Sequence, residues 1–224
     1  MHARSQMHGA VGFIKASRGR IGHNLRPVDH QPSAVVAPQG ERILMHASNF
    51  RKIKRVQDVI HVFHKVNEKI PSKLLLVGDG PERPMAEELA RELKICDEVR
   101  FVGKQNDMEE IFAVTDLFLL PSEYESFGLA ALEAMAAGAA VVSSNAGGLP
   151  EVIEQGVCGY MANVGDITAM SNFALDILKD NDRLLQFKNA AKAQALKFDI
   201  HNIVPQYEKL YLNVAKGAVA AVHK

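Results

Sequence analysis

The sequence has few cysteines, no excess of either charge and no long apolar run, and each shortage argues against a class of protein. Cys96 and Cys158 lie in separate periodic segments without metal-ligand spacing, so we expect reduced thiols and a cytoplasmic protein rather than a disulfide scaffold. The 26 basic and 26 acidic side chains cancel, which gives no global electrostatic reason to expect nucleic acid as a partner. No apolar run reaches the roughly 18 residues of a membrane span, and the first residues lack the apolar core of a signal peptide.

Several catalytic signatures are also missing. No Ser-His-Asp order or nucleophile elbow occurs, so covalent acyl chemistry is not expected. Gly78-Asp79-Gly80 lacks the third glycine of a dinucleotide fingerprint and precedes Pro81, which favours a tight turn. His46 lies in a predicted strand, and His61 and His64 are three residues apart on a predicted helix. Metal binding would need a further convergent ligand, so we predict no metal site.

The chain changes character at residue 40. Residues 1–40 hold five Lys/Arg, four His and one acidic residue without helical or strand periodicity, and we interpret them as a poorly ordered or loosely attached segment. A basic arm for an acidic partner is the alternative interpretation. Residues 41–224 are regular, and an apolar content of 47% over 224 residues is enough for a substantial core.

Short apolar runs alternate with helical patterns along residues 41–224. The runs predict strands at 43–48, 74–78, 99–103, 117–120, 140–144 and 159–162. The helical patterns lie at 56–70, 84–94, 108–114, 127–137, from Pro150, and at 167–179, 182–197 and 201–214. This alternation predicts an α/β, Rossmann-like, doubly wound parallel sheet of about six strands, whose ligands bind beyond the carboxyl ends of the strands.

The stretch from Leu117 to Glu151 contains the main candidate site. Ser126 is a suitable N-cap for an almost wholly apolar helix that Gly138 would end. The carboxylate inside it, Glu133, is too costly to bury unpaired, so we expect it to face a cleft or a donor. Glu125 lies eight residues earlier, about 12 Å of helical rise. A phosphate-favouring helix N-terminus lies between the two. The pattern predicts an elongated ligand with a phosphate between two polyol ends; two solvated carboxylates are the alternative.

A cationic cluster follows the first predicted strand. Arg51 and Lys54, with Lys52 and Arg55 beside them, would bind a diphosphate and stabilise the charge that grows on it as a leaving group. Solvated loop cations are the alternative. Gly147-Gly148 lies at a strand-to-helix turn, where glycine either permits close approach to a ligand or supplies a positive φ.

Taken together, these motifs resemble the retaining glycosyltransferases of family 4, which have the two-domain GT-B fold. The resemblance covers about residues 41–214 and includes Glu125-Ser126-Phe127-Gly128-Leu129 followed by Glu133. The other matching motifs are SNFRKIKRVQDVI (48–60), GDGPE (78–82), VRFVGKQ (99–105) and SNAGGLPEVI (144–153). Within the family, the motifs are most similar to those of the enzymes that join N-acetylglucosamine to L-malate at the start of bacillithiol biosynthesis.

The resemblance implies roles in holding a UDP-sugar. Glu133 would bind the ribose hydroxyls, and Glu125 would contact the transferred sugar near its 3-hydroxyl. Backbone amides of Phe127, Gly128 and Leu129 would meet the sugar and the diphosphate. The chain near Gln105 would face the uracil.

The resemblance also implies how the diphosphate is neutralised. Lys54 would do so without a required metal or cofactor. Asn49 stands where the family usually has an arginine, and Arg51 is the candidate to supply the missing charge.

The GT-B fold needs an N-terminal, acceptor-binding domain of similar size, and residues 1–40 are too short and differently composed. We therefore expect this chain to be the donor half, inactive by itself, with a final helix that packs towards that domain or exposes its apolar surface. The alternatives are other sugar or acceptor specificities, a nucleotide-sugar epimerase, and a non-catalytic interaction module, with a homo-oligomer among the expected assemblies.

Overall fold

The computed structural model describes residues 40–222, with side chains as far as residue 214. Within that range, residues 40–195 belong to one compact unit and residues 196–222 to a second. The segment 1–40 that the sequence sets apart therefore lies, except for Gly40, outside the described residues.

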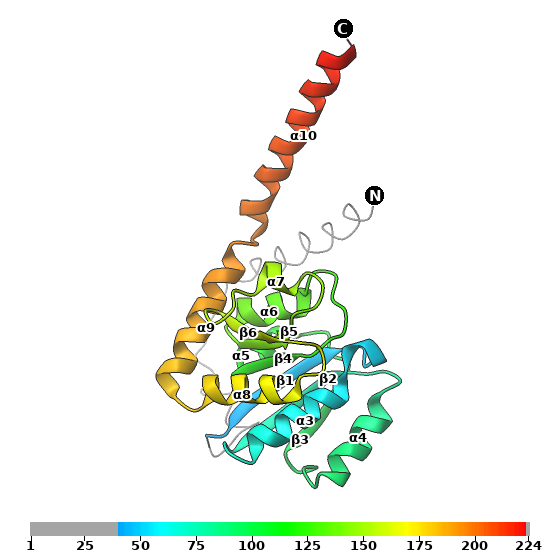
Figure 1. The fold of residues 1–224 in the computed structure, drawn as a ribbon, viewed down its shortest axis with the longest axis vertical. Helices are drawn as coiled ribbons and strands as arrows, with labels where there is room; N and C mark the ends of the chain where they lie inside the picture. Colours follow the sequence, from blue (N-terminus) through cyan, green and yellow to red (C-terminus); the bar gives the residue numbers. More distant parts are fainter. Residues whose placement is uncertain (1–39, 223–224) are drawn as a thin grey trace. The chain divides into compact units, whose positions relative to one another are not determined.

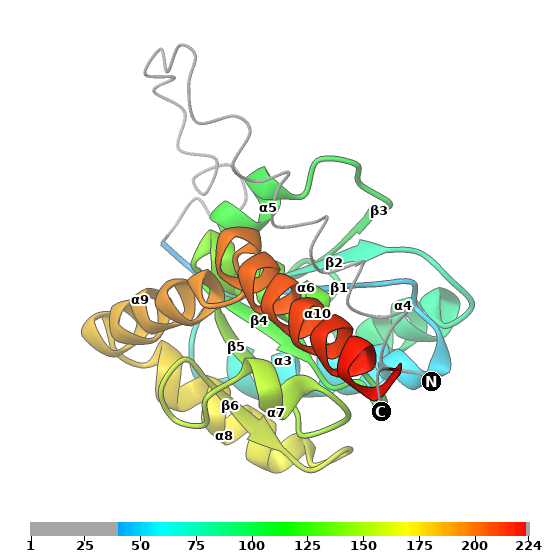
Figure 2. The same cartoon turned by 90° about the horizontal axis from the view of Figure 1, so that it is seen from above.

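All six predicted strands form, and they make one parallel sheet. The strands are β1 (Arg42–Ser48), β2 (Ser72–Gly78), β3 (Val99–Gly103), β4 (Leu117–Leu120), β5 (Ala140–Ser144) and β6 (Gly159–Ala162). Their order is β3-β2-β1-β4-β5-β6, with every neighbouring pair parallel (Figure 2). The Rossmann-like, doubly wound sheet predicted from the sequence is confirmed.

Helices cover both faces of this sheet. They are α3 (Val56–Asn67), α4 (Arg83–Glu92), α5 (Glu109–Ala113), α6 (Leu129–Ala137), α7 (Leu149–Val152), α8 (Ile167–Leu178) and α9 (Asn181–Leu196), with a 3-10 turn, η1 (Lys52–Lys54). Helices α3, α4 and α8 lie on one face, and α6 and α7 on the other (Figure 1). Because both faces are covered, the strands β4 and β5 are buried at every position.

Helix α3 shows how periodicity places the core. Its apolar side chains recur at three- and four-residue spacing, and Val56, Val59, Ile60, Phe63 and Val66 are all buried against the sheet. The helix ends at Asn67, before the Ile70 expected from the apolar pattern. There the Asn67 side chain accepts a hydrogen bond from the Ser72 N–H at 3.0 Å, which turns the chain into β2.

Helix α9 lies at the edge of the sheet where the strands begin. Lys188 donates to the Thr115 carbonyl and to the Asp116 carboxylate, both at 3.1 Å. Arg42, the first residue of β1, donates to the Leu178 carbonyl at 3.3 Å and to the Asn181 side chain at 2.6 Å. The amino edge is therefore covered, and the carboxyl ends of the strands are where the candidate residues gather.

The second unit contains one long helix, α10 (Ile200–Val222), with Pro205 inside it. It extends the helix predicted at 201–214. Large apolar side chains along it, including Leu210, Tyr211 and Leu212, are exposed. The expectation that this helix packs on a further domain stays a prediction.

Candidate functional site

The site lies at the carboxyl ends of β1 and β4, the neighbouring strands at which the strand order reverses. The chain leaves β1 towards β2 on one side, whereas it leaves β4 towards β5 on the other. The loops that follow diverge, and in open α/β sheets such a switch point is where ligands bind. The loop after β1 carries the cationic cluster, and the loop after β4 carries Glu125.

An ion pair joins these two loops. Lys54 donates through Nζ to Glu125 Oε1, and both side chains are mostly buried, with exposed fractions of 19% and 13%. Ser122 donates from Oγ to the same carboxylate oxygen at 2.8 Å, while Ser144 of β5 donates to the Ser122 carbonyl. Two residues that the sequence placed in separate clusters thus form one site. Ser122 and Ser144, which support Glu125, carried no signal in the sequence beyond their place at strand ends.

Helix α6 begins later than expected, so the prediction that Ser126 caps it is wrong. The helix starts at Leu129, with Gly128 in a left-handed conformation (φ 91°) just before it and no side chain capping its N-terminus. Its end at Gly138, also left-handed (φ 94°), is confirmed. Glu125 therefore lies in an extended loop, and the helical rise estimated between it and Glu133 does not apply.

The Gly147-Gly148 turn packs against the residues that precede the helix. Gly148 donates its N–H to the Glu125 carbonyl at 2.9 Å, which holds the Glu125 loop against this turn. A Cβ on Gly147 would lie 1.7 Å from that carbonyl oxygen, and one on Gly148 would lie 2.6 Å from the Ser126 carbonyl oxygen. Gly147 also has a positive φ of 59°. These glycines thus allow the turn to approach the Glu125 loop closely.

Glu133 lies one turn into α6 among buried neighbours. It makes no hydrogen bond or ion pair with any described residue, and burial raises its pKa from 4.5 to about 7. At neutral pH its carboxyl group is therefore divided between the charged and neutral forms, and either form has oxygen atoms available to a ligand.

The remaining candidates, Arg51, Asn49 and Gln105, lie on the loops after β1 and β3. Arg51 is exposed at the start of η1 and forms no ion pair with the described residues, so its charge is available. Asn49 directly follows β1, with its carbonyl packed against Gly80. Gln105 follows β3, the edge strand, and donates to the Val102 carbonyl at 3.0 Å. Among the described residues, Gln105 forms no side-chain hydrogen bond with the Lys54–Glu125 pair.

A tight turn follows Gly78-Asp79, with the Arg83 N–H donating to the Gly80 carbonyl at 3.1 Å. Asp79 accepts the Gly80 N–H at 2.9 Å, and Cβ atoms on the two glycines would lie 1.8 and 2.0 Å from the carbonyl oxygens of Ser48 and Asn49. Residues 78–80 therefore pack closely against Ser48 and Asn49, where the loop that carries the cationic cluster begins.

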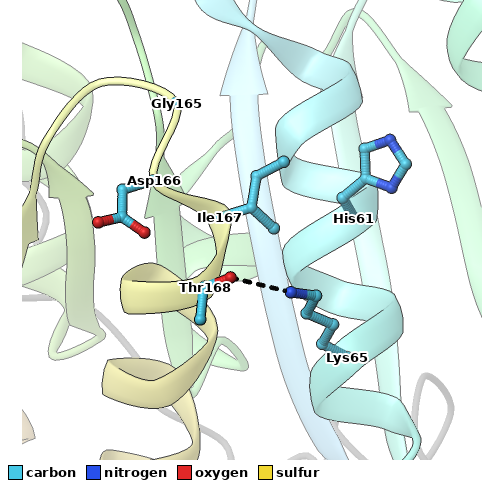
Figure 3. Close-up of a pocket in the computed structure, with 6 residues that line it drawn as sticks. All are labelled: His61, Lys65, Gly165, Asp166, Ile167 and Thr168. Atoms are coloured by element: carbon cyan, nitrogen blue, oxygen red, sulfur yellow. Dashed lines mark hydrogen bonds between the residues drawn. The ribbon is translucent and has the colours of Figure 1, made fainter.

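A shallow hollow of about 350 Å³ lies away from these residues, between α3 and the start of α8 (Figure 3). It is lined by His61, Lys65 and residues 165–168, and Lys65 donates to Thr168 Oγ1 at 3.2 Å across it. None of the site residues predicted from the sequence lines this hollow.

The described residues contain neither a cluster of metal-ligating side chains nor a membrane-spanning helix. They contain no group of three or more His, Cys, Asp or Glu side chains that could hold a metal ion. In the same part of the chain, no helix combines the length and apolar character needed to cross a membrane.

Solved structures confirm the class of fold. The chain superposes with a TM-score of 0.71 on Anabaena HepE in complex with UDP and glucose, at 26% identity, covering 81% of this chain and 50% of that one. Sucrose-phosphate synthase from Thermosynechococcus elongatus gives a TM-score of 0.71 at 26% identity, covering 83% and 49%. The chain has the fold of one half of a GT-B glycosyltransferase.

The family follows from the sequence match. Residues 28–194 match the family described as Glycosyl transferases group 1, and the chain belongs to this family. It is 45% identical over 179 residues to N-acetyl-alpha-D-glucosaminyl L-malate synthase of Bacillus anthracis, a match that covers 80% of this chain and 47% of that protein. The chain thus spans about half the length of the curated relatives it matches.

The close approach at Gly147 predicts a large loss of stability on substitution. Gly103 has a similar positive φ of 74° but no atom within 4 Å of a built Cβ, so Gly103→Ala measures backbone strain alone, about 1–2 kcal/mol. Gly147→Ala adds the collision with the Glu125 carbonyl, and we expect it to lower the free energy of unfolding by about 1–3 kcal/mol more. Urea denaturation compares the two. Equal losses would show that the turn can move away from the Glu125 loop.

Proposed function

We propose that this chain is the nucleotide-sugar-binding half of a retaining glycosyltransferase and that it binds UDP-N-acetylglucosamine. The Lys54–Glu125 pair carries this proposal, because it places a cation for a diphosphate beside a carboxylate for a sugar hydroxyl at the switch point of the sheet. The 45% identity to an N-acetylglucosaminyl malate synthase supports the sugar and suggests L-malate as the acceptor of the full enzyme.

The ligand would extend from Glu133 to Glu125. Ribose hydroxyls donate to Glu133, and the diphosphate lies at the uncapped N-terminus of α6, where backbone N–H groups and the helix dipole favour an anion. The hexose lies beside Glu125, with backbone amides of Phe127, Gly128 and Leu129 around it. Gln105 would meet the uracil only if the base extends towards the β3 edge of the sheet.

The charge arrangement supports transfer without a bound metal. As the bond between the sugar and the diphosphate breaks, negative charge grows on the departing phosphate, and Lys54, Arg51 and the α6 N-terminus stabilise it. The acceptor attacks from the face that the leaving group vacates, so the configuration is retained, and the departing phosphate oxygen takes the acceptor proton. Because the uncharged Asn49 stands where the family usually has an arginine, Arg51 would have to neutralise more of the phosphate charge.

The chain alone should bind the donor and transfer sugar negligibly. The match covers 47% of the malate synthase, and the proposed donor residues lie on the loops of one sheet. Calorimetry with UDP and UDP-N-acetylglucosamine tests the binding. No heat at millimolar ligand, with the protein shown to be folded, would overturn the proposed function.

The raised pKa of Glu133 predicts a proton release on binding. Ribose hydroxyls that donate to a carboxylate favour its charged form, so the bound pKa falls below about 7. Affinity for UDP-N-acetylglucosamine should then rise about tenfold from pH 6 to pH 8 and level off above the free pKa. UDP-N-acetylglucosamine is the suitable ligand because both of its phosphates are esterified, whereas the terminal phosphate of UDP titrates near pH 6.

The control is Glu133→Gln, which keeps the side-chain shape but cannot ionise. Calorimetry at pH 6.5 in buffers of different ionisation enthalpy counts the protons released. Wild type should release a fraction of a proton and Glu133→Gln none, with weaker binding. Equal proton counts would show that the ribose does not contact Glu133.

The ion pair predicts opposite effects for its two partners on UDP binding. Lys54→Met removes the diphosphate partner and should weaken UDP about tenfold to a hundredfold, as for a charge-assisted hydrogen bond. Glu125→Gln frees Lys54 from a competing carboxylate, and UDP should bind about twofold to fivefold more tightly, ~0.5–1 kcal/mol, because the desolvation of this mostly buried pair offsets most of its attraction. The preference for UDP-N-acetylglucosamine over UDP should shrink in that variant.

Lys69→Met is the matched control, because Lys69 is exposed just beyond the last turn of α3 and its removal changes net charge equally. It should leave both affinities unchanged. A weakening of UDP by Glu125→Gln would mean that Glu125 positions Lys54 and does not compete with the ligand for it.

A further inference from the structure

A fully buried histidine lies on β1 just before the cationic loop. His46 is 0% exposed, and its ring contacts polar atoms at both nitrogens. Its Nδ1 lies 2.9 Å from the carbonyl oxygen of Leu119 on β4, and its Nε2 lies 2.8 Å from Ser48 Oγ. The ring therefore connects the two strands whose loops form the site.

The partners determine how the protons are placed. Because the Leu119 carbonyl can only accept, His46 Nδ1 carries the hydrogen. Burial lowers the pKa of His46 to about 4, the Leu119 carbonyl opposes this shift and the nearby Lys54 charge adds to it, so the ring is neutral at pH 7. A neutral ring accepts at Nε2, which makes Ser48 the donor there. The Ser48 oxygen in turn accepts the Phe50 N–H at 3.2 Å.

These hydrogen bonds end at the residue that sets the direction of the cationic loop. Phe50 has a positive φ of 41°, which a bulky residue rarely adopts, and its side chain is completely buried. Its carbonyl accepts the Glu82 N–H at 2.9 Å. The His46 ring is stacked with the Phe50 and Phe118 rings, at centroid distances of 6.2 and 6.4 Å. Phe50 is thus held on several sides, directly before Arg51.

We propose that His46 is a positioning residue for the donor site: through Ser48 and Phe50 it orients the loop that carries Lys54 relative to β4 and Glu125. An apolar side chain could fill the same space but could not link the Leu119 carbonyl to the start of this loop. This inference rests on the proposed function for its ligand, whereas the hydrogen-bonded chain exists without one.

Ser48→Ala is the mildest test, because it breaks the chain of hydrogen bonds and leaves the imidazole in place. By calorimetry well below the unfolding midpoint, it should weaken UDP-N-acetylglucosamine binding about threefold to tenfold, the range for one or two neutral hydrogen bonds. The control is Ser171→Ala on α8, which removes a buried serine hydroxyl that donates to the Ile167 carbonyl, whereas Ser48 is half-buried. Ser171→Ala should leave the affinity unchanged at a similar cost in stability.

A double-mutant cycle separates positioning from general destabilisation. If Ser48 acts through Lys54, Ser48→Ala should have no further effect on affinity in the Lys54→Met background. Equal effects in both backgrounds, or equal effects of Ser48→Ala and Ser171→Ala, would overturn the positioning role. A folded wild type that binds no ligand would overturn the proposed function and this role with it.

Nuclear magnetic resonance of the imidazole tests the chain of hydrogen bonds without any ligand. Spectra that correlate ring carbons and nitrogens should show the neutral tautomer with the hydrogen on Nδ1 at pH 7, and Ser48→Ala should shift the Nε2 resonance. A neutral ring with its hydrogen on Nε2 would overturn the inference, whatever the binding data show.

Discussion

The reversal of strand order between β1 and β4 is the constraint on which the site depends. Parallel strands require crossovers that carry each loop away from the sheet, and only at this reversal do neighbouring loops diverge. Lys54 and Glu125, 71 residues apart in the chain, meet there. The serines at the ends of β4 and β5 and the Gly147-Gly148 turn then hold the Glu125 loop in place.

The charged side chains near this point differ in whether they have a partner of opposite charge. Lys54 and Glu125 neutralise each other in a mostly buried pair, whose desolvation is offset by the Ser122 hydroxyl. Arg51 is exposed and unpaired among the described residues, whereas Glu133 is half-buried and titrates near neutrality. A ligand that carries a diphosphate between two sets of hydroxyl groups matches this arrangement, because each group on the protein would gain a partner of the complementary kind.

The comparisons with known proteins establish the family and the fold, whereas the sugar and the acceptor belong to the proposed function. The match over residues 28–194 establishes a group 1 glycosyltransferase domain, and the solved structures establish its fold. Since the chain spans about half of those proteins, the sugar is proposed from the likeness and the site, and the acceptor from the likeness alone. The contacts of the buried His46 add a further feature. Its neutral imidazole links β1 to β4, the two strands whose loops form the site.

Much of the fold was predictable because it depends on local patterns. Apolar runs placed all six strands, the spacing in α3 placed its buried face, and Gly138 ended α6 where expected. The residue types at the strand ends also predict diphosphate and sugar chemistry, and that part stays a prediction. The start of α6 was missed because Gly128 takes a left-handed conformation, while the residues before it pack against the distant Gly147-Gly148 turn. The Lys54–Glu125 pair and the hydrogen bonds of His46 likewise depend on strand order. Hydrophobic periodicity is local and was readable in the sequence, whereas these contacts join strands that only the folded sheet makes neighbours.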